Sequence, residues 1–411
     1  GRSKLFKDRF EGEYQGPRLI VLSWIRFTMR TPHWYPLVET PAYVMLVTLI
    51  LLPTVVTVPI YVQMIGISTL VIFLGSARAV HKFISQKAGD KSVEPREVIK
   101  RGSVFRFPII ASCTLICLFL AFKYLPKQIV SFCLTFGSLS MATFNAALMY
   151  SALIAESKIA PKKFTDSIPK LKNWVEISPM DILCVLGVIP VAAWYWYKKH
   201  WLPNNVLSTS LALTSVEAMA LADFQSAAIL LCGLFFYDIF WVFGSTKVFG
   251  DNVMVSVAKQ FDGPIKLVFP RFLRAGPSDQ SMLGLGDIVI PGFFIALILR
   301  YDAERFQKRL KYSEKPIFFY TVIVFYFLGL ASTYLALLLF HAAQPALLYL
   351  VPACLLSVLV LAAVLGELKD LFMYAESEGE ASKKEDGSEE KKKKAEGNNS
   401  MEGANESKKT K

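Results

Sequence analysis

Two aspartates stand inside long apolar stretches of this chain, where a carboxyl group is energetically costly. Asp238 follows Tyr237 within the run Phe235–Gly244. Asp287 ends the tetrapeptide Gly284-Leu285-Gly286-Asp287 and is followed by the apolar run IVIPGFFIALIL. A charged side chain at the centre of a bilayer costs roughly 2.5–3.5 kcal/mol on insertion scales, so such residues mark functional sites by default. The pair therefore suggests acid–base chemistry within a membrane.

Two carboxyl groups about one water molecule apart, in a medium of low dielectric constant, do not both ionise easily and share one proton. One then serves as general base and the other as general acid, and the pair can activate water to attack an amide carbonyl. The sequence assigns neither role to one residue. Neither apolar run contains a Lys or Arg to pair with its aspartate. The simpler interpretation is that each aspartate is a satisfied polar residue or part of an ion pathway.

The glycines before Asp287 bear on how a substrate would approach. Gly284 and Gly286 allow the backbone to unwind locally and to approach a ligand closely. An extended substrate could then pair its amides with exposed main chain, as in strand addition.

The elements that carry these aspartates are long apolar segments. The chain has 411 residues, of which 54% are hydrophobic, and its mean hydropathy is +0.42. The apolar residues gather in stretches of about 17–25 residues, the length that a helix needs to cross a bilayer. Helices are the expected spanning form, because backbone amides find no water partner in lipid. The segments are 42–57, 59–77, 107–122, 128–155, 180–197, 206–222, 224–244, 282–299, 317–340 and 344–365.

We predict an all-α fold, a polytopic transmembrane helical bundle of nine spans formed by the second to the tenth segment. The first segment, 42–57, is short and ends among Pro53 and Pro59. It is expected to be a reentrant or interfacial piece, or else an extra span.

The basic residues predict the orientation of the spans. The net charge of +12 could suggest nucleic acid, but Lys and Arg crowd the short loops between apolar segments. Loops 78–106, 156–179 and 300–316 hold eight, five and six of them, whereas the opposite loops at 123–127 and 198–199 hold two each. Cytosolic loops are the ones enriched in Lys and Arg, so nine spans place the N-terminal side outside the cytosol and the C-terminus inside it. Five basic residues in 246–280 break the trend, and seven in 1–41 would suit an extra span.

Metal and cofactor chemistry is not expected. All six cysteines lie in apolar segments without a C-x-x-C spacing, and the four histidines form no H-E-x-x-H motif. Glu217, in the segment 206–222, is expected to hydrogen-bond between helices rather than to act in catalysis. Aromatic residues near Lys198 and Lys199 are typical of a belt at one membrane face.

The C-terminal tail, residues 366–411, alternates Glu-rich and Lys-rich patches and is expected to be disordered and cytosolic. Lys408 and Lys409 stand fourth and third from its end. This is the dilysine pattern by which coat proteins retrieve membrane proteins to the endoplasmic reticulum. The plainer alternative is a Lys-rich tail that happens to end in this way.

A third motif, Pro345-Ala346-Leu347, follows Gln344 at the start of the last apolar segment. Alone it predicts only a helix N-terminus. Together with Tyr237-Asp238 and the Gly-x-Gly-Asp motif, in this order, it resembles the intramembrane aspartyl proteases of the presenilin and signal peptide peptidase kind. The stretches most similar to the signal peptide peptidase family are 107–115, 252–255, 264–270 and 344–354. The resemblance covers roughly residues 59–374.

The resemblance implies a presenilin-like fold and an aspartic endopeptidase that cleaves within transmembrane segments. It implies Asp238 and Asp287 as catalytic residues, and the Pro-Ala-Leu tripeptide as a wall contacting substrate, with Tyr237, Leu285 and Gln344 as neighbours of the site. Implied substrates are signal peptides left in the endoplasmic reticulum membrane, oriented with the N-terminus toward the cytosol. Membrane lipid, quality-control proteins of that membrane and a homo-oligomer are the expected partners.

We divide the chain into an N-terminal extension (1–56), a transmembrane scaffold half (57–205), a catalytic half (206–365) and the tail (366–411). Two departures from the family pattern stand out. Residues 1–56 have no recognised counterpart, and Ser245–Asp251 lengthen the connection after the Tyr-Asp segment.

Two rival functions remain at this stage. A proton-coupled transporter or channel could use the aspartates as a relay, in which case no peptide bond is cut. A non-catalytic membrane chaperone would tolerate the loss of Asp238.

Overall fold

The computed structural model describes residues 35–87, 97–99, 101–156, 178–250, 253–271, 280–309, 315–340 and 344–375. The chain divides into two units, residues 1–373 and 374–411, and only residues 374–375 of the second are described. The fold below is that of the first unit. The predicted disordered tail with Lys408 and Lys409 lies outside the described residues, apart from its first ten positions.

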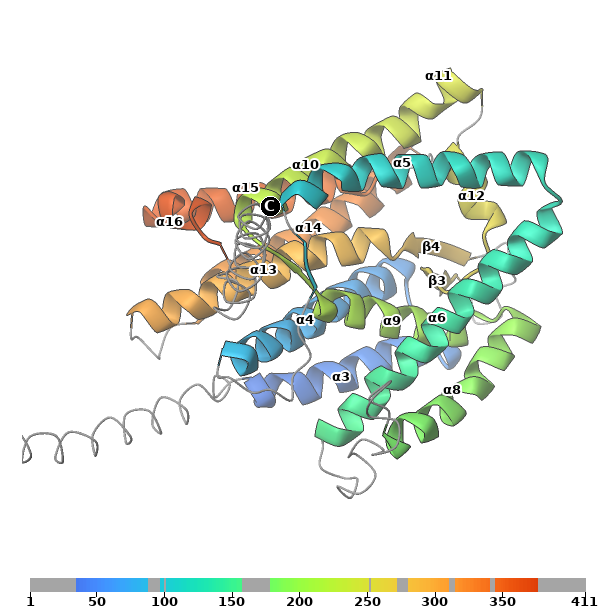
Figure 1. The fold of residues 1–411 in the computed structure, drawn as a ribbon, viewed down its shortest axis with the longest axis horizontal. Helices are drawn as coiled ribbons and strands as arrows, with labels where there is room; N and C mark the ends of the chain where they lie inside the picture. Colours follow the sequence, from blue (N-terminus) through green and yellow to red (C-terminus); the bar gives the residue numbers. More distant parts are fainter. Residues whose placement is uncertain are drawn as a thin grey trace, which may run out of the picture. The chain divides into compact units, whose positions relative to one another are not determined.

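The described chain is almost wholly helical (Figure 1). The long helices are α3 (Tyr35–Leu51), α4 (Ile60–Lys87), α5 (Arg101–Tyr124), α6 (Lys127–Glu156), α8 (Pro179–Lys198), α9 (Trp201–Ala218), α10 (Phe224–Ile239), α13 (Gly286–Arg309), α14 (Ile317–Phe340) and α15 (Leu347–Leu365). The short helices are η1 (Leu52–Thr54), the π-helical turn η2 (Phe240–Gly244), α11 (Ser245–Phe249), α12 (Val253–Gln260) and α16 (Leu368–Phe372).

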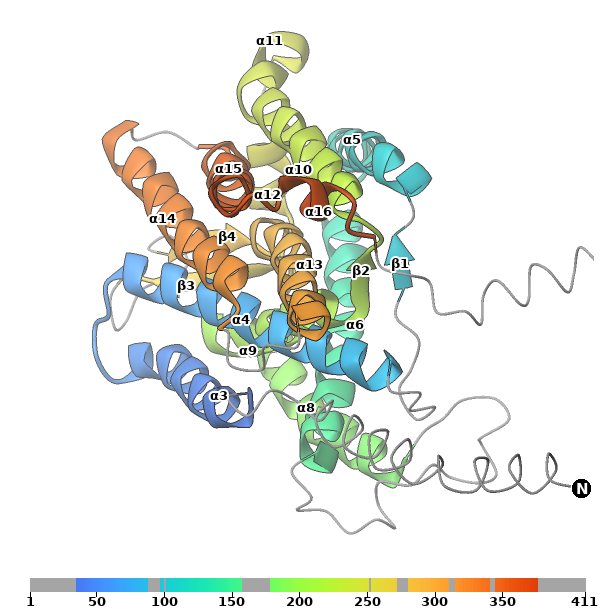
Figure 2. The same ribbon diagram turned by 90° about the vertical axis from the view of Figure 1, so that its left-hand side faces the viewer.

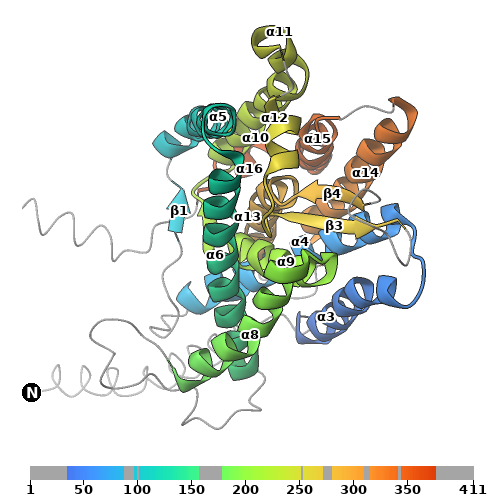
Figure 3. The same cartoon turned by 90° about the vertical axis from the view of Figure 1, so that its right-hand side faces the viewer.

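Two small sheets, which the sequence did not predict, join the helices. Strands β1 (Glu97–Ile99) and β2 (Met219–Leu221) pair in parallel, and β3 (Lys266–Pro270) and β4 (Gln280–Gly284) form an antiparallel pair. The second pair lies beside α9 and leads directly into α13 (Figure 3).

The predicted polytopic helical bundle is confirmed, but not its count of nine spans. Among the described residues, seven helices are long and apolar enough to cross a membrane: α4, α5, α6, α8, the continuous stretch from α10 to α11, α14 and α15. The helices α9 and α13 match the two remaining predicted spans but are more polar. α9 carries Asn204, Asn205 and Glu217, and α13 carries Arg300 and Asp302. The first apolar segment forms a shorter helix, α3, that ends at η1 just before Pro59.

The α13 helix runs through the middle of the bundle and is packed against α4, α9, α10, α14 and α15 (Figures 1 and 2). Its residues Phe293–Arg300 are all less than 5% exposed. The spanning helices at the periphery instead expose apolar side chains, such as Ile109 of α5 and Phe144 of α6, in the manner of lipid-facing surfaces. The middle of the helix that begins with Gly286-Asp287 is therefore fully enclosed by the fold.

Two glycines let α4 and α13 approach α9 at one side chain, Val216. A Cβ atom added at Gly75 of α4 would lie 2.9 Å from Val216 Cβ, and one added at Gly292 of α13 would lie 2.7 Å from Val216 Cγ2. Neither position has room for a methyl group. This contact between three helices therefore fixes the position of α13 at Gly292, five residues after Asp287.

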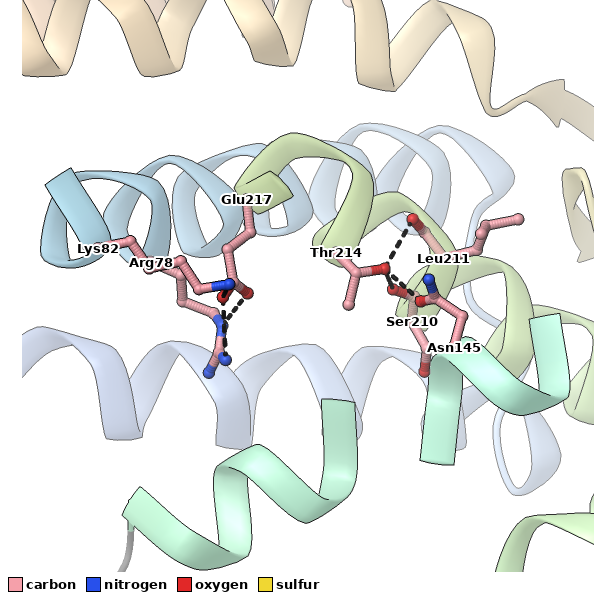
Figure 4. A network of polar contacts seen from close by, with 7 residues as sticks. All are labelled: Arg78, Lys82, Asn145, Ser210, Leu211, Thr214 and Glu217. Atoms are coloured by element: carbon pink, nitrogen blue, oxygen red, sulfur yellow. Dashed lines mark hydrogen bonds and ion pairs between the residues drawn. The ribbon is translucent and has the colours of Figure 1, made fainter. Parts of the chain in front are cut away.

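Polar contacts hold these helices beside the Val216 contact and at the far end of α13. Glu217 of α9 is 5% exposed and binds Arg78 of α4 at 2.5 Å and Lys82 at 2.8 Å (Figure 4). This confirms the expected polar contact between helices. At the far end of α13, the Arg305 side chain binds Glu367 at 2.8 Å, and Asp302 accepts a hydrogen bond from the backbone N–H of Phe319 at 2.9 Å. Glu217 of α9 and Asp302 and Arg305 of α13, which interrupt the apolar pattern, are thus each bound to a partner on another element.

The residues Ser245–Gly250, which depart from the family pattern, extend the helical path of α10 and η2 as α11. The helix ends at Gly250, whose φ of 79° lies in the left-handed region that favours glycine. The ring of Phe249 packs on Trp241 and on Phe119 of α5. The added segment is therefore bound to the bundle.

We predict that Gly292→Ala lowers the free energy of unfolding by about 1–3 kcal/mol, because overpacking in a filled core forces neighbours to shift. Adding Val216→Ala should restore part of that loss, since it removes the opposing methyl groups. Denaturant unfolding of the purified protein in detergent measures both effects. Gly187→Ala in α8 is the control, because a Cβ there meets no atom within 4 Å. If Gly292→Ala were as stable as Gly187→Ala, the tight contact with Val216 would be contradicted.

Candidate active site

Asp238 lies on the inward face of α10 and is 3% exposed. The next turn, η2, is π-helical, a distortion that often accompanies functional sites. Trp241 in this turn is buried, and its indole N–H donates a hydrogen bond to Ser112 Oγ of α5 at 3.2 Å. A Cβ at Gly233, one turn before Asp238, would lie 3.1 Å from Pro108 of α5. The stretch 107–115, noted in the sequence, thus supports the helix that carries Asp238.

The strand pair β3–β4 positions the start of α13. The register pairs Lys266 with Gly284 and Pro270 with Gln280, so β4 ends at the first glycine of the motif. The hydrogen bonding between the two segments continues one residue beyond this pair, since the Leu285 N–H donates to the Ile265 carbonyl oxygen at 3.0 Å. Within the described residues, β4 pairs with β3 alone, so the edge of β4 that faces away from β3 has no strand partner.

Polar side chains of α9 anchor the other edge of β3. The Asn205 side chain accepts from the Val268 N–H at 2.8 Å and donates to the Val268 carbonyl at 2.7 Å, in the pattern of a neighbouring strand. Asn204 and Ser208 both donate to the Lys266 carbonyl. Buried polar groups must be hydrogen-bonded, which accounts for these residues in a membrane protein. They leave β4 as the exposed strand.

Asp287 lies in the first turn of α13, where the Leu285 carbonyl oxygen accepts the first helical hydrogen bonds. A carboxylate is favoured there by the free N–H groups and the helix dipole. Asp287 as a whole residue is half-buried, and Leu285, two residues earlier, is buried. Neither Gly284 nor Gly286 has a positive φ, so a left-handed backbone is not what requires glycine at these positions. The nearest group to a Cβ at Gly284 would be Asp287 Oδ2, at 3.6 Å, so glycine keeps the approach to this carboxyl open.

The third motif meets Asp238 directly. Pro345, Ala346 and Leu347 are buried at the start of α15, and the Leu347 N–H donates a hydrogen bond to Asp238 Oδ2 at 3.0 Å. The first backbone N–H groups of a helix have no partner within it, so the carboxylate caps one of them. Gln344 is half-buried next to this turn.

The structure therefore brings together the residues that the sequence singled out. The helices α10, α13 and α15 contact one another, and the carboxyl groups of Asp238 and Asp287 interact electrostatically. No direct hydrogen bond joins these two carboxyl groups in the described part of the chain. Tyr237 is half-buried beside them, and its ring packs 6.3 Å from that of Trp241.

Other polar residues lie away from this site. Glu217 belongs to the ion pair with Arg78, and Asp223 and Asp181 cap the first turns of α10 and α8. Sequence reasoning did not select Asn204, Asn205 or Ser208, which hold the strand leading to Asp287. Their signal was the unusual polarity of the first two turns of an otherwise apolar helix.

The site offers two carboxyl groups for chemistry. That of Asp238 accepts a hydrogen bond from a backbone N–H, and that of Asp287 follows the end of strand β4. Paired acids in this setting suit general acid–base catalysis on an amide of an extended peptide. Among the described residues, no group of three or more His, Cys, Asp or Glu side chains could hold a metal ion.

Comparison with known proteins adds independent information. The model of the family described as "Signal peptide peptidase" matches residues 88–378, a range that contains all three motifs. The signal peptide peptidases of Mus musculus and Homo sapiens are each 38% identical to this chain over 330 residues, which cover 77% of this chain and 83% of theirs. Intramembrane protease 2 of Caenorhabditis elegans is 40% identical over 252 residues, covering 58% of this chain and 52% of its own.

We predict that Asn205→Ala loosens the β3–β4 pair, because it removes two buried hydrogen bonds, each worth about 0.5–1.5 kcal/mol. Hydrogen–deuterium exchange at residues 266–270 and 280–284 should become faster. Thr209→Val is the matched control on α9, since the Thr209 hydroxyl is buried and makes no hydrogen bond. Unchanged protection in the Asn205 variant would show that the strand needs no anchor from α9.

Proposed function

Because this chain belongs to the signal peptide peptidase family and is an intramembrane aspartic protease, we propose that Asp238 and Asp287 are its catalytic pair. The observation that carries the proposal is the convergence of three separate motifs. Asp238 of α10 accepts a hydrogen bond from Leu347 of α15, and Asp287 at the start of α13 interacts electrostatically with Asp238.

The reaction is hydrolysis of a peptide bond by one water molecule. One aspartate, as the carboxylate, takes a proton from the water while the water oxygen attacks the amide carbonyl carbon. The other aspartate, which is protonated, gives its proton to the carbonyl oxygen. The tetrahedral diol then collapses. The carboxyl that took the proton from water gives it to the amide nitrogen, which leaves as an amine, while the other carboxylate takes a proton from one diol hydroxyl group, so that a carboxylic acid forms and the pair returns to its starting state. Because the pair shares its protons, we assign base and acid to the dyad rather than to one aspartate.

The substrates are transmembrane peptides, and we propose signal peptides left in the membrane after signal peptidase has acted. The name of the curated relatives supports this class. A bilayer helix hides its amides in internal hydrogen bonds, so cleavage requires local unwinding. The open edge of β4 ends at Gly284 and could receive the unwound strand next to Asp287. Substrates would span with the N-terminus toward the cytosol.

The Pro345-Ala346-Leu347 tripeptide, with Gln344, is proposed as the wall of the site that contacts the substrate. Residues 206–365 would form the catalytic half and 57–205 the scaffold. This division is supported by the origin of all three motifs in the later helices.

We further propose residence in the endoplasmic reticulum membrane, with the N-terminal side in the lumen and the C-terminus in the cytosol. The loop charges and the Lys408-Lys409 pair support this placement.

Replacing both lysines by alanine should move the protein to later compartments, as fluorescence microscopy would detect. Retention of that variant in the reticulum would rule out the dilysine signal. Quality-control partners and a homo-oligomer are proposed on the resemblance to the family alone.

We predict that Asp238→Asn and Asp287→Asn each lower cleavage of a signal-peptide substrate by roughly 100-fold or more, the scale of general acid–base catalysis. Purified protein in a defined lipid mixture, with products identified by mass spectrometry, gives the measurement. Asp223→Asn is the control on the same helix as Asp238. It removes a carboxylate that caps α10, and asparagine caps equally well.

Cleavage at the wild-type rate by either active-site variant would end the proposal. The transporter alternative makes a different prediction, because its Asn variants would lose ion flux from a protein that cuts no peptide. No comparison favours it.

A further inference from the structure

A cavity of about 580 Å³ is lined by none of the residues of the three motifs. It is lined by residues of the end of α5, the first turns of α6, the end of α8, and the segment that follows α12. In Figure 1 these ends all lie toward the right-hand side. The cavity takes no part in the chemistry described above.

The cavity lies at a membrane surface. Residues 125–126 join α5 to α6, and both of these helices are long and apolar enough to span. So short a turn between two spans must lie at the bilayer boundary. The end of α8 shares the cavity and therefore lies at the same boundary.

The polar lining carries charges of both signs. Lys127 and Lys199 contribute ammonium groups, and Asp262 contributes a carboxylate. Desolvation lowers the pKa of Lys199, and the nearby Asp262 carboxylate acts in the opposite direction. The Thr135 hydroxyl donates to the Asp262 backbone carbonyl and so ties this segment to α6. The lining thus combines two basic side chains and one acidic one.

Aromatic rings form another wall. Phe132 of α6 meets Trp196 of α8 edge-on, with ring centroids 5.5 Å apart. The ammonium group of Lys199 lies 5.3 Å from the Trp196 ring, so this face already accepts a cation.

The rim next to these rings is apolar and open. Tyr124, Ile129, Phe132 and Phe136 are 75%, 61%, 57% and 58% exposed. In a membrane-spanning protein such surfaces face lipid chains. A ligand with a charged end in the cavity would therefore have its apolar part alongside α6.

We propose that this cavity binds the head group of a zwitterionic phospholipid, with its acyl chains lying along the exposed face of α6. The phosphodiester would bind Lys127 and Lys199, and the ammonium group of the head group would lie between Asp262 and the aromatic wall. Charge-assisted hydrogen bonds favour the first contact, and charge attraction with cation–π interaction favours the second. The apolar rim selects a lipid over a free phosphate.

The test uses the full chain in nanodiscs that contain a trace of phosphatidylcholine with a photoreactive group on one acyl chain. Crosslinks within residues 122–136 are quantified by mass spectrometry against crosslinks to α14. The variant pair Lys127→Gln with Lys199→Gln should lower labelling of 122–136 by roughly fivefold, because it removes both charge-assisted contacts. The matched control pair is Lys123→Gln with Lys198→Gln, which changes the same net charge at neighbouring positions outside the cavity and should label as wild type.

Competition by unlabelled ligands shows which kind of head group the cavity prefers. Unlabelled phosphatidylcholine should compete better than phosphatidylglycerol, whereas inorganic phosphate should not compete. Asp262→Asn should reverse the preference between the two lipids, because it removes the group that favours a cationic head. Equal labelling of both lysine pairs, equal competition by the two lipids, or competition by inorganic phosphate would overturn the proposal.

Discussion

The hydrogen bond between the Leu347 N–H and Asp238 Oδ2 joins α15 to α10 through a carboxyl group that is 3% exposed. A carboxyl group buried in a membrane protein must find a donor, and here one comes from a helix N-terminus, where backbone N–H groups have no partner within the helix. The same bond places Pro345-Ala346 beside the first aspartate. The α13 helix packs against both of these helices, and the Asp287 carboxyl group near its start interacts electrostatically with that of Asp238.

The rest of the fold keeps α13 in that position. At one level, Val216 fits against Gly75 and Gly292, so α4, α9 and α13 meet at backbone distance. At the far end, Arg305 binds Glu367 and Asp302 binds the start of α14. Before the helix begins, Asn205 fixes β3, and β3 fixes β4. The site is thus built on rigid elements, which is what holding two carboxyl groups at one substrate bond requires.

Sequence reasoning could predict what depends on composition and order. The apolar lengths predicted the helices, and the ordered motifs predicted the family, which the comparisons confirm. The sequence did not reveal the β3–β4 pair, because QSMLG has little strand propensity and pairs with β3, which side chains of α9 hold in place. It also overstated how apolar α9 and α13 are. Glu217 and Arg305 are tolerated because partners far along the chain, Arg78 and Glu367, neutralise them, and such pairs cannot be found from one segment alone.

The most direct measurement is an electron cryomicroscopy structure of the protein in nanodiscs with a peptide analogue whose scissile amide is replaced by a hydroxyl-bearing transition-state mimic. We predict that the hydroxyl group lies between the carboxyl groups of Asp238 and Asp287, with the peptide backbone paired to the open edge of β4 and the Leu347 N–H still bound to Asp238. A mimic bound elsewhere, or two carboxyl groups that never contact the same atom of it, would contradict the shared-proton pair on which the proposed reaction depends.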